Sequence, residues 1–142
     1  MDERLIAYVY FFNNKQDYFE CHEYGESLWL DTGHPVVLKG LIQAAVCLYH
    51  LENGNARGAT SMWFRARNYL EPYYPIYEGI DICQLVRDLD HHFKQVPKEW
   101  YDKQVPADVV ASLHLAPVLL RVTDPVLRQK VEAFAAQDTE ER

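Results

Sequence analysis

Residues 17–52 read DYFECHEYGESLWLDTGHPVVLKGLIQAAVCLYHLE and decide the fold, because they predict two consecutive helices joined by a short turn. Asp17 caps the first helix, and Glu20 follows three residues later in a capping-box arrangement. Residues 36–52 form the second helix, whose broad apolar surface is typical of a central helix contacted from two sides. Since the turn at residues 31–35 is short, we expect the two helices to pack as antiparallel neighbours.

Further helical segments flank this hairpin. Residues 5–12 are apolar on every side, so periodicity does not separate a strand from a helix, and the flanking residues favour a short buried helix. Asn55 and Asp81 each stand at the start of an amphipathic segment and are predicted to cap a helix there. Asp124, followed by a proline, opens a final amphipathic helix.

The predicted fold class is therefore all-α, a compact bundle of about five core helices arranged in antiparallel hairpins. A single domain is expected over residues 1–142, with its helical core at about 5–95. A C-terminal extension, about 97–142, ends in the last helix. Within it, residues 115–122 are a short apolar run that fits either an extended segment or a buried helical turn.

The amino-acid composition argues against some classes of function. Hydrophobic residues make up 49% of the chain, enough to bury a core without disulfides. The net charge of −7 argues against binding to nucleic acid or to an anionic membrane, both of which use clustered Lys and Arg. No apolar run is long enough to span a bilayer. Three cysteines without a Cys-x-x-Cys pair predict buried thiols in a reducing compartment, so a cytoplasmic location is expected.

The first helix of the hairpin carries a polar stripe. His22, Glu26 and Trp29 are four and three residues apart and therefore share one helix face, among residues expected to face the core. Burying an imidazole or a carboxylate costs free energy unless the group forms a hydrogen bond or an ion pair. Glu23 points off the stripe and is predicted to be solvated, although it is able to swing in as a further ligand.

The second helix carries a matching stripe of Gln43, Cys47 and His50. If antiparallel packing sets His22 beside His50, then Glu26 lies beside Cys47, and the tryptophan of the first stripe lies beside Gln43. Two imidazoles and a carboxylate are a ligand set that suits zinc or iron with one position open for water or substrate. The predicted metal ligands are thus His22, Glu26 and His50, and Glu26 is the best candidate for a catalytic residue, as a general base on a bound water. The predicted lining of the pocket is Gln43, Cys47, Trp29 and Glu23.

Several short motifs occur in order over residues 5–93. They are Tyr18-Phe19-Glu20, His22-x-x-x-Glu26-x-x-Trp29, Leu41-Ile42-Gln43, Tyr49-His50, Gly54-Asn55-x-x-Gly58-Ala59 and Gly79-Ile80-Asp81. This series resembles the bacterial and archaeal family called domain of unknown function 309. The resemblance implies a helical fold without an established activity, and a His-x-x-x-Glu-x-x-aromatic motif that has been suggested to bind metal. The segment from Pro97 departs from the compact family pattern, and Ser27-Leu28 replaces a more acidic run, which leaves one candidate carboxylate fewer.

Three classes of function stay open on the sequence. One is a metalloprotein, with a metal-dependent hydrolase as its most specific form. The second is a helical interaction module in which the polar stripes form a buried hydrogen-bonded network without metal. The third is a small-molecule binding protein with its pocket between the two helices of the hairpin. A homo-oligomer is a further expectation, because the C-terminal segment carries more apolar residues than one domain is expected to cover.

Overall fold

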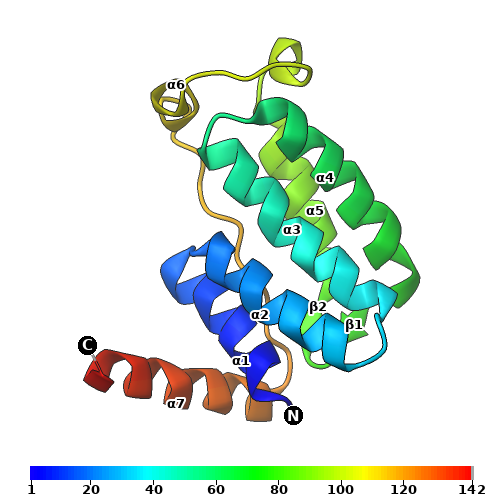
Figure 1. The fold of residues 1–142 in the computed structure, drawn as a ribbon, viewed down its shortest axis with the longest axis vertical. Coiled ribbons are helices and arrows are strands. Elements are labelled where there is room, and N and C mark those ends of the chain that lie inside the picture. Colours follow the sequence, from blue (N-terminus) through cyan, green and yellow to red (C-terminus); the bar gives the residue numbers. More distant parts are fainter. Residues whose placement is uncertain (142) are drawn as a thin grey trace.

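A computed structural model describes residues 1–141, and helices dominate it, as the sequence predicts (Figure 1). Two short strands form an antiparallel hairpin in which Ile76 pairs with Asp81 and Tyr77 with Ile80. The α-helices are α1 (Glu3–Tyr10), α2 (Tyr18–Asp31), α3 (Val36–Glu52), α4 (Ala56–Leu70), α5 (Ile82–Lys94), α6 (Ala107–Ala111) and α7 (Pro125–Glu141). The remaining elements are a π-helical turn η1 (Phe11–Lys15), two 3-10 turns η2 (Glu71–Tyr73) and η3 (Lys98–Trp100), and strands β1 (Ile76–Tyr77) and β2 (Ile80–Asp81). The all-α class is therefore confirmed.

Side-chain caps begin the helices at the expected residues. The carboxylate of Asp17 accepts from the backbone N–H of Glu20 at 3.1 Å, and that of Asp81 accepts from the N–H of Gln84 at 2.8 Å. The amide oxygen of Asn55 caps α4 in the same way. Each contact satisfies one N–H group that a helix start leaves without an intrahelical partner. The stretch at 5–12, ambiguous in the sequence, is buried helix throughout.

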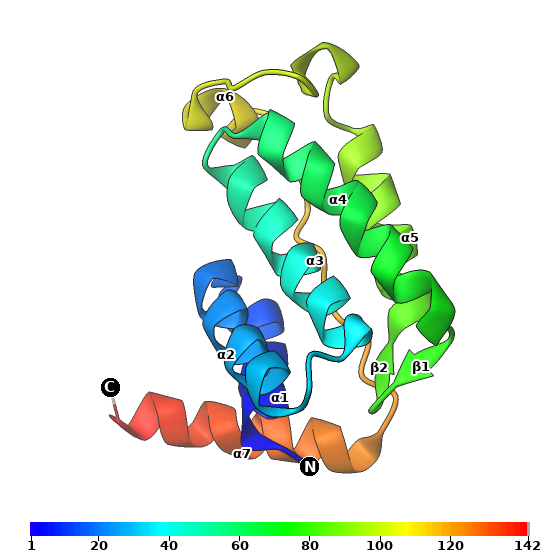
Figure 2. The same ribbon diagram turned by 45° about the vertical axis from the view of Figure 1, so that its right-hand side comes forward.

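Helix α3 is the centre of the bundle, because α2 packs on one side of it and α4 on the other. The three helices run as two successive antiparallel hairpins, and α5 lies against α4 (Figure 2). The ring of Trp63 on α4 stacks on that of Phe93 on α5 at 4.8 Å between centroids, and its Nε1 donates to Asp90 at 2.9 Å. Burial of these apolar faces is the main source of stability.

The C-terminal extension returns along the bundle. Residues 112–124 are largely extended and run from α6 at one end of the molecule to α7 at the other (Figures 1 and 2). The side chain of Asn13 binds both backbone groups of Leu120, accepting from its N–H at 2.7 Å and donating to its carbonyl oxygen at 2.9 Å. Val122 forms an antiparallel bridge with Ile80. The segment 115–122 is thus extended chain, the first of the two predicted alternatives.

Helix α7 lies across α1. The ring of Phe134 contacts those of Tyr10 and Phe11, with centroids 5.1 Å and 6.2 Å away, and the hydroxyl of Tyr10 donates to Asp138 at 2.6 Å. The extension therefore covers the outer face of the helix that opens the chain. Among residues 1–141, no helix combines the length and the apolar character that crossing a membrane requires.

Candidate functional site

His22 and Glu26 lie beside the buried face of α2, so the prediction that they face the core is wrong, whereas Trp29 packs against the core. The residues of α2 that are buried are Tyr18, Cys21, Gly25 and Leu28. The side chain of His22 is 35% exposed and that of Glu26 is 45% exposed. The reason is that α2 packs against both α1 and α3, so its most buried line points between these two neighbours.

The contact between α2 and α3 is set by a glycine. A Cβ atom on Gly25 would lie 2.8 Å from Ile42 Cγ1, so only glycine permits this approach. Phe19 lies near Tyr49, with 6.3 Å between ring centroids. These two contacts displace α2 by about one turn from the register that would set His22 directly against His50. Trp29 packs on His34 in the turn after α2, with 4.3 Å between ring centroids.

The predicted pairing of Trp29 with Gln43 forms no hydrogen bond. The Nε1 atom of Trp29 and the Oε1 atom of Gln43 are both buried, and neither has a hydrogen-bond partner among the described residues. Cys47 is fully buried in the core, and its Sγ donates to the carbonyl oxygen of Ala44 at 3.0 Å. Burial raises the pKa of the Cys47 thiol well above its ordinary range, so this residue is a buried apolar side chain rather than a pocket ligand.

Each ring nitrogen of His22 lies close to a carboxylate oxygen. Its Nε2 lies 3.0 Å from Glu26 Oε2, and its Nδ1 lies 3.3 Å from Glu23 Oε1. Glu23 therefore contacts the imidazole instead of remaining solely in solvent. On α3, Asn55 Nδ2 lies 3.5 Å from His50 Nδ1, and burial lowers the pKa of His50, so its neutral form is favoured.

His22 and His50 line one pocket of about 220 Å³, called here the motif pocket. Its lining residues are Tyr18, Phe19, His22, Val46, Tyr49 and His50. Glu26 lies outside this lining and borders the neighbouring surface with Glu23. The structure thus brings His22 together with Glu26, and His22 together with His50. In residues 1–141 it gathers no three His, Cys, Asp or Glu side chains closely enough to hold a metal ion.

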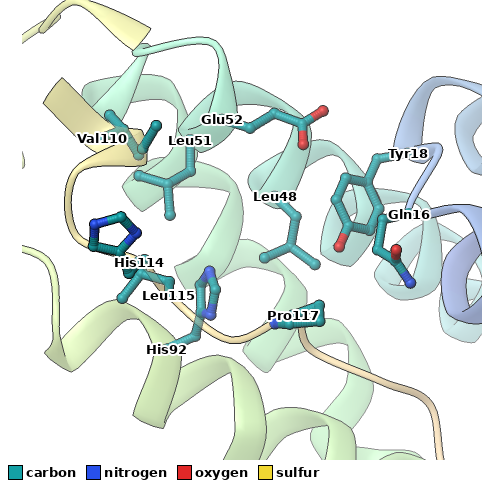
Figure 3. A pocket seen from close by; sticks show the side chains of 11 residues that line it. Gln16, Tyr18, Leu48, Leu51, Glu52, His92, Val110, His114, Leu115 and Pro117 are labelled. Carbon is teal, nitrogen blue, oxygen red and sulfur yellow. The ribbon is translucent and has the colours of Figure 1, made fainter. Parts of the chain in front are cut away.

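A second cavity, of about 270 Å³, lies where the first half of the chain meets the extension, and we call it the junction pocket (Figure 3). Sequence reasoning missed it, because its walls come from segments far apart in the chain and no local spacing connects them. Its lining residues are Gln16, Tyr18, Leu48, Leu51, Glu52, His92, Val110, Ala111, His114, Leu115 and Pro117. Tyr18 is common to both pockets and separates them.

Together these features define a helical protein in which the motif pocket and the junction pocket share Tyr18. Residues 5–62 match the family model described as Domain of unknown function (DUF309). The chain is also 32% identical over 97 residues to the uncharacterized protein YpuF of Bacillus subtilis (strain 168), an alignment that covers 64% of this chain and 55% of YpuF. The chain thus aligns with about half the length of this relative, and no solved structure matches it.

The resemblance to domain of unknown function 309 is therefore confirmed over residues 5–62, the segment that matches the family model. The match includes every residue that lines the motif pocket. The junction pocket instead joins the family segment to residues 92–117, which lie beyond it.

Proposed function

We propose that this protein is a helical ligand-binding protein that holds a small planar organic molecule in the motif pocket. The observation that carries the proposal is the convergence of two imidazoles and three aromatic rings on one cavity of about 220 Å³. Small-molecule sites typically combine apolar and aromatic walls with a few oriented polar groups.

The two kinds of lining residue have complementary roles in this proposal. Phe19 is 53% exposed although its ring is large and apolar, and a planar ligand stacked between Phe19 and Tyr49 would remove both faces from water. His22 supplies an oriented ring face, because Glu23 and Glu26 contact both of its nitrogens. His50, whose neutral form is favoured, offers a donor and an acceptor.

Indole is a suitable probe, since it is planar and carries one N–H donor. We expect indole to raise the melting temperature of the protein and to shift the imidazole resonances of His22 and His50 in NMR spectra. Phe19→Ala should abolish both effects. Phe64→Ala is the matched control, because Phe64 is an aromatic residue of similar exposure, 48%, on α4 and lies outside the motif pocket. Equal responses of the two variants, or no response of the native protein, would overturn the proposal.

A divalent metal is a second candidate ligand for the same surface. It is favoured by the contact between His22 Nε2 and Glu26 Oε2, a pair one helical turn apart, and by His50 on the same pocket. His22 and Glu26 would hold such an ion, and His50 would have to move toward them to act as the third ligand. Glu26 would then be the group nearest a bound water, as the hydrolase hypothesis requires.

Elemental analysis of protein purified without an affinity tag tests this second candidate. Stoichiometric zinc or iron that is lost in His22→Ala would support it. A metal content well below one ion per chain in a fully folded sample would reject it and leave Glu26 as a carboxylate that orients the His22 ring.

A further inference from the structure

The junction pocket contains two buried polar side chains with unused hydrogen-bonding capacity. Tyr18 is only 6% exposed, and its hydroxyl has no hydrogen-bond partner among the described residues. His92 is 9% exposed, and its ring donates one hydrogen bond to the backbone carbonyl of Ala116. That bond leaves the second ring nitrogen of the neutral imidazole as an acceptor. Figure 3 shows the His92 ring standing in the cavity between Leu48 and Leu115.

Two side chains that are mostly buried and keep hydrogen-bonding capacity beside one cavity are suited to bind a ligand there. The hydroxyl of Tyr18 and the second nitrogen of His92 both accept hydrogen bonds. Glu52, on the rim at the end of α3, adds a carboxylate that accepts only. The complementary ligand therefore supplies donors.

The charge of the pocket indicates the same class of ligand. Within residues 1–141, the lining contains Glu52 and neither lysine nor arginine. Asp17 lies close enough to raise the pKa of Glu52, together with the larger effect of burial. Glu52 is exposed at the rim of the pocket, and a carboxylate beside a second carboxylate is stabilised by a cation and repels an anion. The remaining walls are apolar, with Leu48, Leu51 and Leu115 among them.

We propose that the junction pocket binds a small organic cation, a primary amine that carries an aromatic or branched aliphatic group. The ammonium group donates to Glu52 and to the free acceptors of Tyr18 and His92, while the apolar group packs on the leucines. The cavity of about 270 Å³ limits the ligand to the size of a single-ring compound. This site shares Tyr18 with the motif pocket but is otherwise lined by different residues, and the proposal does not depend on the function proposed above.

Three probes of similar shape and different charge test the proposal by isothermal titration calorimetry. They are phenethylamine, a cation; phenethyl alcohol, which is neutral; and hydrocinnamate, an anion. At about pH 8 an alkyl amine is protonated and an ordinary imidazole is neutral, so Glu52 dominates the charge of the pocket. We expect phenethylamine to bind at least tenfold more tightly than phenethyl alcohol, and hydrocinnamate to show no binding. Equal binding of all three probes, or preference for the anion, would overturn the proposal.

Variants of residues that line the junction pocket test whether the amine binds there. Glu52→Gln should weaken phenethylamine about tenfold and leave phenethyl alcohol unchanged, whereas Glu99→Gln, at an exposed residue outside the lining, should change neither. Tyr18→Phe retains the ring that packs in the core and removes only the hydroxyl, so it should weaken the amine without loss of fold. Phe19→Ala, which disrupts the motif pocket, should leave amine binding intact. Unchanged amine affinity in both Glu52→Gln and Tyr18→Phe would refute the assignment.

Discussion

The double hydrogen bond between Asn13 and Leu120 is expected to fasten the C-terminal extension to the first helix. Asn13 lies in η1, and its side-chain amide pairs with both the N–H and the carbonyl oxygen of Leu120, 107 residues further along the chain. Both bonds are partly buried. Asn13→Ala removes both partners at once and leaves two backbone groups without protein ligands.

The size of the effect follows from the two bonds. A hydrogen bond of this kind contributes about 1 kcal/mol, so Asn13→Ala should lower the free energy of unfolding by about 2 kcal/mol. With a urea dependence of about 2 kcal/mol per molar, the unfolding midpoint should fall by about 1 M. Circular dichroism during urea titration measures this shift.

Two further variants make the Asn13 prediction refutable. Asn14→Ala is the control, because Asn14 is the exposed neighbour in the same turn, and it should change the midpoint little. Asn13→Asp retains the acceptor for the Leu120 N–H but sets a carboxylate oxygen against the Leu120 carbonyl, so it should destabilise at least as much as alanine. If Asn13→Ala unfolds at the same urea concentration as Asn14→Ala, the extension is held by other contacts.

The other predictions concern a turn, a buried histidine and the thiols. Gly54→Ala should lower the melting temperature far more than Gly33→Ala. Both glycines have φ near +85°, a conformation that costs alanine about 1 kcal/mol. Only at Gly54 would the new Cβ also collide with a backbone carbonyl oxygen. Burial lowers the pKa of His92 below 6.5, so the unfolded chain binds this proton first as the pH falls. The free energy of unfolding should therefore decrease below about pH 6.5, less steeply in His92→Gln; parallel curves would contradict this assignment. Iodoacetamide should label the half-buried Cys83 in the native protein and the two fully buried cysteines only after unfolding, as mass spectrometry of the labelled peptides would show.

Local chemistry explains why the helices were predictable. Caps at Asp17, Asn55 and Asp81 act within three residues of chain, so their effect can be read from the sequence and is present in the structure. The same locality explains the contact of His22 with Glu26, since residues four apart on a helix are neighbours whatever the helix packs against. The family motif lies in this locally determined part of the chain.

Helical periodicity alone does not decide which residues of the motif are buried. A helical wheel shows that His22 and Glu26 share a face, but α1 and α3 decide which face is covered, and the approach at Gly25 sets the register between α2 and α3. The three predicted ligands consequently do not gather into one group among the described residues.

The sequence by itself determined the helical class, the starts of the main helices and the polar pairs one turn apart, because each depends on residues close together in the chain. Only the tertiary structure decided the path of the extension and the existence of the junction pocket. Tyr18, Glu52 and His92 line the same cavity because three helices and the extended segment of the C-terminal extension pack around it. Such a meeting depends on long-range packing, which short-range spacing does not encode.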